Sequence, residues 1–266
     1  MLDILLASLA LGLVAGLLAG LFGIGGGLVI VPVLVILLSS QGLPEKTVLL
    51  MAVATSLATI ILTAISSVIA HHRLGAVKWD YVWRLAPMIV LGSAGGAVIA
   101  DWISAEALRY VLAGFLSYVA VLMAVESKPK PVEGLEPRVR VVMDSLAGLL
   151  IGVVSAIVGI GGGTLTVPYL VRCKLPMRNA VAISSACGLP IALSGTLSYA
   201  WLGWNASALP VHSLGYVYWP AWLGIAATSV LTAPVGAKLA NQLPAKTLKR
   251  YFAWLLLAMV IKLVWR

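Results

Sequence analysis

The residues best suited to binding chemistry are two copies of one glycine-rich segment. The sequence Gly-Ile-Gly-Gly-Gly occurs at residues 23–27 and again at residues 159–163. Each copy lies inside an apolar run, and each is followed by a short apolar segment that contains a proline, Pro32 or Pro168. Because glycine weakens a helix, four glycines in five residues predict a helix break. The backbone N–H groups at such a break can bind a small anion without a charged side chain.

Neutral polar side chains accompany both glycine segments. Thr55 and Ser56 lie in the apolar run that follows the first copy, and Ala186-Cys187-Gly188 occupies the matching place after the second. Backbone N–H groups and hydroxyls together make an anion site that needs no fixed charge. The candidate substrate-binding residues are Gly23, Gly25, Gly26, Gly27, Thr55, Ser56, Gly159, Gly161, Gly162, Gly163, Thr164, Ser184, Ser185 and Cys187.

The charged residues argue against a cation or metal site. Asp80, Asp101, Glu106 and Asp144 all fall near the ends of apolar runs. A charge in the middle of a bilayer is costly and usually functional, and a metal ion would need carboxylates or clustered His and Cys ligands. We therefore expect no metal and no cofactor, and a small oxyanion is favoured over a cation as the ligand.

His71 and His72 form a candidate proton relay, because imidazole titrates near neutral pH. They come at the end of an apolar run, directly before Arg73. That position favours a role in an interfacial loop, and the matching positions of the second half hold no histidine.

The composition is that of an integral membrane protein. Of the 266 residues, 61% are hydrophobic and 10% are charged, and the mean hydropathy is +1.06. Soluble domains carry about 25% charged residues. The net charge of +9 does not indicate nucleic-acid binding, because the basic residues lie in short loops between apolar runs.

The chain divides into two related halves. Residues 1–125 form the first predicted repeat and residues 141–266 the second, while segment 126–140, with three prolines and seven charges, is a solvated linker. The small-residue pairs Gly12/Gly16 and Gly148/Gly152 recur at the same separation as the glycine segments, 136 residues. Small residues at every fourth position predict close helix packing in both halves.

The charge distribution predicts how the halves cross the membrane. If each glycine segment returns to the side from which it entered, as a re-entrant hairpin or as two short crossings, one side holds four of the 18 Lys and Arg residues: Lys46, Arg109, Lys262 and Arg266. The positive-inside rule places that side outside. Both termini are then predicted outside and segment 126–140 in the cytoplasm.

With that topology each half makes an odd number of crossings. The fold class predicted is therefore an all-α polytopic membrane protein with two inverted-topology repeats, each with a glycine-broken helix plus three spans. Inverted repeats with broken helices at the midplane are an architecture of secondary transporters.

The doubled pattern G-x-G-G-G-x-x-x-V-P, at residues 23–32 and 159–168, resembles the sulfite exporter TauE/SafE family of membrane permeases. The resemblance spans essentially the whole chain. It implies a multi-pass transporter in the bacterial or archaeal cytoplasmic (inner) membrane that moves sulfite, sulfonates or related sulfur anions. Thr55 and Ser56 would line the first half of the site, whereas Ala186-Cys187-Gly188 departs from the family's Thr-Ser pair.

Three functions stay open on the sequence. The first is a secondary transporter, an exporter of a small sulfur oxyanion or sulfonate, and the second is a passive anion channel with the same broken helices. The third is an intramembrane enzyme that uses His71, His72 or Cys187, but no nucleophile, base and orienting acid occur at matching depth. We therefore predict a non-enzymatic membrane protein whose partners are the anion and the lipid bilayer, with no nucleic acid. The sequence predicts no oligomeric state.

Overall fold

The computed structural model describes residues 2–22, 26–124, 141–206, 209–240 and 245–265. These residues form ten helices and one short antiparallel hairpin. The elements are α1 (Leu2–Phe22), α2 (Gly27–Ser39), α3 (Glu45–Arg73), α4 (Trp79–Trp102), α5 (Ala105–Ala124), α6 (Val141–Val158), α7 (Gly163–Arg172), α8 (Met177–Leu202), β1 (Ser213–Leu214), β2 (Val217–Tyr218), α9 (Trp219–Ala240) and α10 (Ala245–Val264).

The helical class predicted from composition is confirmed. Within the described ranges, α3, α4, α5 and α8 are each long and apolar enough to cross a membrane. The predicted linker, 126–140, lies outside the described residues. The apolar run that His71 and His72 were predicted to end is α3, which continues through them to Arg73, and α4 begins at Trp79.

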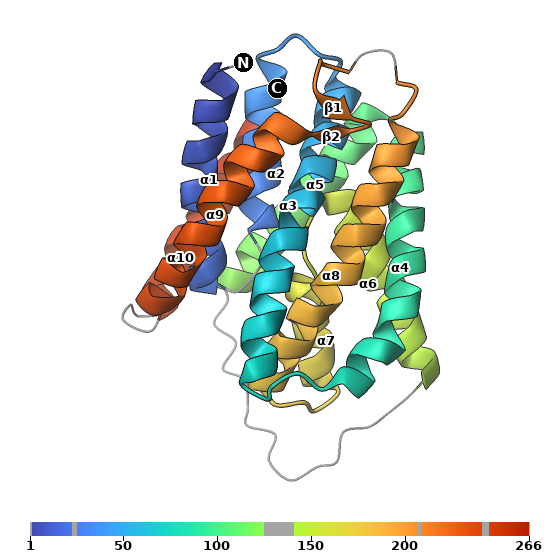
Figure 1. Ribbon diagram of the computed structural model, residues 1–266, viewed down its shortest axis with the longest axis vertical. Helices are drawn as coiled ribbons and strands as arrows, with labels where there is room; N and C mark the ends of the chain where they lie inside the picture. Colours follow the sequence, from blue (N-terminus) through green and yellow to red (C-terminus); the bar gives the residue numbers. More distant parts are fainter. Residues whose placement is uncertain (1, 23–25, 125–140, 207–208, 241–244, 266) are drawn as a thin grey trace.

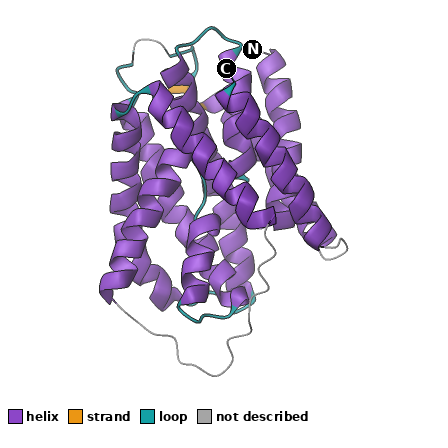
Figure 2. Cartoon of the chain, turned by 180° about the vertical axis from the view of Figure 1, so that it is seen from behind, coloured by secondary structure: helices purple, strands orange, loops and turns teal. Residues whose placement is uncertain are grey.

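The two ends of the molecule are easily told apart (Figures 1 and 2). At one end, here called the terminus end, α1 begins and α10 ends, and the α2–α3 connection and the β-hairpin lie there too. At the opposite end α6 begins, and the α3–α4 and α7–α8 connections lie there. Thus α1 starts and α2 finishes at the terminus end, whereas α6 starts and α7 finishes at the opposite end.

The two halves of the chain interlock rather than stand side by side. Helix α1 packs along α9 and α6 packs along α4, so the first helix of each half lies against the fourth helix of the other. Helices α3 and α8 pack together, as do α5 and α10. Exchanging the two halves turns the α1–α9 pairing into the α6–α4 pairing. The α3–α8 and α5–α10 pairings stay the same.

Small residues set the distance between the interlocking helices. A Cβ added at Gly12 would lie 2.6 Å from the Ile225 carbonyl oxygen, and one at Gly148 would lie 2.9 Å from the carbonyl oxygen of Leu85. Ile225 and Leu85 are 140 residues apart, the separation by which the later helices of the two halves correspond. The close packing predicted from the small-residue pairs is confirmed, and its register is the same in both halves.

Helix α3 lies at the centre of the molecule, surrounded by α2, α8 and α9. Every residue from Val48 to Ile60 is buried. A helix that is apolar on all sides is expected to be buried on all sides. This helix carries Thr55 and Ser56, so both hydroxyls face protein.

Candidate functional site

The two glycine-rich connections meet in the interior. A Cβ added at Gly27 would lie 2.6 Å from the Gly159 carbonyl oxygen and 3.0 Å from the Cα of Ile160. Such a short approach between two backbones leaves no room for any side chain. Segments 132 residues apart are thereby joined, and the start of α2 lies against the end of α6.

The glycines at this contact have backbone angles that other residues rarely adopt. Gly26 precedes α2 with a φ of 76°, and Gly159 follows α6 with a φ of 74°. The N–H groups of Gly159 and Ile160 both donate to the Ser155 carbonyl oxygen, which ends α6. A positive φ at these points costs glycine nothing and turns the chain sharply.

The first-half hydroxyls have partners inside the protein. The Ser56 hydroxyl donates to the Gly159 carbonyl oxygen at 2.8 Å, and the Tyr218 N–H donates to the Thr55 hydroxyl oxygen at 3.0 Å. Both side chains have no exposed surface. They fasten α3 to the second glycine connection and to the β-hairpin.

The second-half hydroxyls at the same connection have no such partners. The side-chain oxygens of Ser155, Thr164, Thr166 and Ser184 are buried and make no hydrogen bond. An unsatisfied buried polar group costs about 1–3 kcal/mol. Four such hydroxyls lie around this helix break, and each has a proton that it can donate.

Thr166 and Ser184 lie beside Gly162. A Cβ added at Gly162 would lie 2.8 Å from the Thr166 hydroxyl oxygen and 3.5 Å from the Ser184 carbonyl oxygen. Helix α7 begins at Gly163, and the first N–H groups of a helix have no partner within it. Hydroxyl groups and the positive end of a helix are thus brought together without any charged side chain, a combination that suits a small anion.

Other predicted site residues lie elsewhere. The Ser185 hydroxyl donates to the Val181 carbonyl oxygen and accepts from Ser67 at 3.1 Å, which ties α8 to α3. Cys187 is fully buried among apolar side chains. Gly23 and Gly25 lie outside the described residues.

The histidines are far from the glycine contact. His71 comes 15 residues after Ser56 in the same helix, which is about 22 Å along the helix axis. His72 accepts a hydrogen bond from the Trp79 indole at 3.2 Å and is exposed. The pair therefore lies in the last turn of α3, next to the α3–α4 connection.

Two features of the interior were not predicted as part of the site. Ser155 was not among the predicted site residues because it precedes the glycine segment, although it lies one helical turn before Gly159. Asp144 was placed near a helix end, and it is buried there with a hydrogen bond from the Tyr169 hydroxyl. Across the described part of the chain, no three His, Cys, Asp or Glu side chains gather as a metal site.

Comparison with known proteins gives a consistent result. The family model described as "Sulfite exporter TauE/SafE" matches residues 8–263. A "Probable membrane transporter protein" from Haemophilus influenzae is 40% identical over 265 residues, which cover 99% of both chains. The "Probable membrane transporter protein MJ0441" from Methanocaldococcus jannaschii is 28% identical over 90% of this chain and 87% of its own. No solved structure matches the chain.

Proposed function

This chain belongs to the sulfite exporter TauE/SafE family of membrane transporters, and on that premise we propose that it exports a small sulfur-containing anion, such as sulfite or an organosulfonate, across the cytoplasmic membrane. The protein is a multi-pass membrane transporter and not an enzyme. The substrate, the direction of transport and the binding site are our proposal.

The observation that carries the proposal is the set of four buried hydroxyls without partners around the Gly159–Gly163 connection. An oxyanion accepts hydrogen bonds, and each of these hydroxyls has a donor to give. Sulfite and sulfonates present several oxygens on a compact, charged head, which suits several donors arranged around one point. The substrate would lie against Gly162, where α7 begins.

Two inverted halves are the second part of the proposal. The exchange symmetry of the helix pairings supports two repeats, and the return of α1–α2 and α6–α7 to opposite ends supports their inversion. Alternating access would then be a movement of one set of helices relative to the other around the Gly27–Gly159 contact.

The orientation follows from the placement of positive charge. Of the described residues, Arg73, Lys78, Arg172, Lys174 and Arg178 lie at or next to the connections at the opposite end. Lys46, Arg109 and Lys262 belong to the helix ends at the terminus end. The positive-inside rule supports a cytoplasmic opposite end and external termini.

The test is transport in proteoliposomes made with the purified protein. Sulfite, thiosulfate, sulfate and a two-carbon sulfonate are each supplied as labelled anions under an imposed proton gradient or membrane potential. We expect saturable movement of at least one sulfur anion, with a raised KM in Thr166→Val and Ser184→Ala. If none of the four moves in folded protein, the sulfur-anion assignment is wrong.

The same assay separates a transporter from a passive channel. A transporter saturates and moves its substrate uphill when a second gradient is supplied, whereas a channel does neither. Accumulation above the equilibrium level would support coupled transport, and linear, strictly downhill flux would favour the channel.

A further inference from the structure

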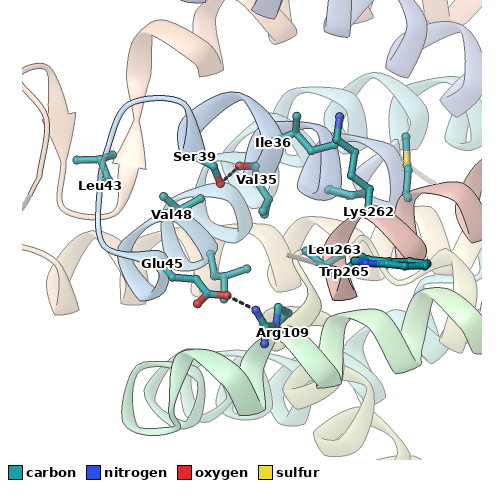
Figure 3. A pocket seen from close by; sticks show the side chains of 13 residues that line it. Val35, Ile36, Ser39, Leu43, Glu45, Val48, Arg109, Lys262, Leu263 and Trp265 are labelled. Carbon is teal, nitrogen blue, oxygen red and sulfur yellow. Dashed lines mark hydrogen bonds and ion pairs between the residues drawn. The ribbon is translucent and has the colours of Figure 1, made fainter.

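A pocket of about 590 Å³ opens at the terminus end (Figure 3). Its walls come from α2, α3, α5 and α10. Its lining runs along α2 from Pro32 to Ser39 and does not include Gly162, Thr166 or Ser184, where the transported anion is proposed to bind. This pocket is therefore separate from the proposed transport site, and nothing in the proposed function uses it.

Two cations and one acid line the pocket. The Arg109 guanidinium, from α5, is paired with the Glu45 carboxylate at 3.0 Å, and Lys262 comes from α10. The Arg109 side chain is 17% exposed and that of Glu45 is 53% exposed. One positive charge is left over after the ion pair, so the pocket favours an anion.

Arg109 has donors to spare. Its Nη1 is paired with Glu45, and its Nη2 has no hydrogen-bond partner among the described residues, so the terminal N–H groups are not all used. A guanidinium carries five N–H donors in a planar fork that matches a carboxylate, phosphate or sulfonate. An arginine in a pocket that still has unpaired N–H groups is a typical binding residue for an anionic head group.

Apart from Ser39, whose hydroxyl donates to the Val35 carbonyl oxygen, the rest of the lining is apolar. Pro32, Val35 and Ile36 of α2 face Met259 and Leu263 of α10 across the pocket. A free inorganic ion would gain no binding free energy from apolar walls. A hydrocarbon chain, in contrast, gains about 0.8 kcal/mol of binding free energy for each methylene that it buries.

We propose that this pocket binds an amphiphilic anion, with its charged head on Arg109 and its apolar tail between α2 and α10. Lys262 adds a second positive charge at the rim. The head group can belong to a soluble alkyl sulfonate or to an anionic phospholipid, because both present the same chemistry. At the matching position of the second half, Met177 takes the place of Glu45.

The two sources are distinguished in nanodiscs. In the first arm the protein is held in neutral phosphatidylcholine and titrated with octanesulfonate by calorimetry. In the second arm the bilayer contains phosphatidylglycerol, and lipid that stays bound after release into detergent is measured by native mass spectrometry. The variants are Arg109→Gln, Arg109→Lys, Lys262→Gln and Glu45→Gln.

The expected changes in binding affinity follow from the charge that each variant removes. Arg109→Gln should weaken binding about tenfold or more, because a charge-assisted hydrogen bond is worth roughly 1.5–3 kcal/mol. Arg109→Lys should retain part of the affinity, and Glu45→Gln should raise it, since the competing carboxylate is gone. Lys46→Gln is the matched control, because Lys46 lies at the same end but donates to the Asp101 carbonyl oxygen outside the pocket.

The possible results identify the ligand or contradict the proposal. Loss of octanesulfonate binding in Arg109→Gln identifies a soluble amphiphilic anion, and loss of bound phosphatidylglycerol identifies a lipid. If neither ligand binds the wild-type protein, or if binding in both arms is the same in Arg109→Gln, Glu45→Gln and wild type, the proposal is wrong. Sulfite transport is measured in parallel, so a failed pocket is not mistaken for a failed transporter.

Discussion

The hydroxyl groups of the two halves are used differently around the same helix breaks. In the first half, Ser56 and Thr55 are hydrogen-bonded to backbone groups of the second half and of the β-hairpin. In the second half, Thr164, Thr166 and Ser184 are equally buried and have no partner. At the breaks, the first-half hydroxyls are therefore hydrogen-bonded to other parts of the protein, whereas the second-half hydroxyls have no partner within the described structure.

This difference predicts that substitutions in the two halves will have different effects. Changes on the first-half side should lower stability, and changes on the second-half side should lower affinity for the transported anion while leaving stability unchanged. The four predictions below test that division, from the largest expected effect to the smallest.

The largest effect is expected at the contact between the two glycine connections. Gly27→Ala would place a methyl group 2.6 Å from the Gly159 carbonyl oxygen, and a backbone cannot move aside as a side chain can. Overpacking of this kind costs about 1–3 kcal/mol, and transport should be lost with it. Thermal unfolding in detergent and transport in proteoliposomes measure the two effects.

Gly161→Ala is the matched control for that change. Its added methyl would meet only the Ile60 side chain, at 3.6 Å, which is ordinary contact. Equal unfolding temperatures for the two variants would contradict the close approach of the connections.

The second prediction concerns Ser56. In Ser56→Ala the buried Gly159 carbonyl oxygen loses the hydrogen bond that it accepts at 2.8 Å, which should cost about 1–3 kcal/mol of stability. The comparison variant is Ser184→Ala, which removes a hydroxyl that has no partner and should leave the unfolding temperature unchanged. A destabilised Ser184→Ala beside a normal Ser56→Ala would reverse the roles assigned to the two halves.

The third prediction concerns affinity. Thr166→Val keeps the shape of the side chain and removes its hydroxyl, which is buried and without a partner. We expect the KM for the transported anion to rise about five- to tenfold, as for the loss of one hydrogen bond worth about 1 kcal/mol, while the unfolding temperature stays the same or rises slightly. An unchanged KM would remove Thr166 from the proposed site.

The smallest effect is expected from the histidine pair. His71→Gln combined with His72→Gln should change the transport rate by less than about twofold, since the pair lies about 22 Å along α3 from Ser56. The measurement is the initial rate with and without a proton gradient. A selective loss of the gradient-driven rate would restore the relay hypothesis.

Much of the fold could be predicted from hydropathy and from the repeated glycines. The apolar run that was predicted to hold Thr55 and Ser56 is α3, from Glu45 to Arg73, and the second predicted repeat begins with α6 at Val141. The small-residue pairs predicted close packing, and Gly12 and Gly148 do pack against helix backbones. These features are local, because they depend on how each residue type behaves in a helix within an apolar medium.

The site residues stay a prediction, and the structure shows how differently their hydroxyls are paired. Thr55 and Ser56 were expected to contact the ligand, yet each is hydrogen-bonded within the protein. Thr164 and Ser184 were named on the same grounds and lack partners. Residue type alone does not distinguish a buried hydroxyl that is hydrogen-bonded within the protein from one that lacks a partner.

The sequence by itself determined that this chain is a membrane protein, where its apolar helices lie and that glycine segments interrupt it twice, because hydropathy and the absence of a side chain act within a few residues. Only the tertiary structure decided which hydroxyls are satisfied. Ser56 is joined to a residue 103 positions away and Thr55 to one 163 positions away. Whether a buried hydroxyl has a partner depends on which distant residues the fold places beside it, and this separates the hydroxyls that fasten the helices from those that have no partner in the described structure.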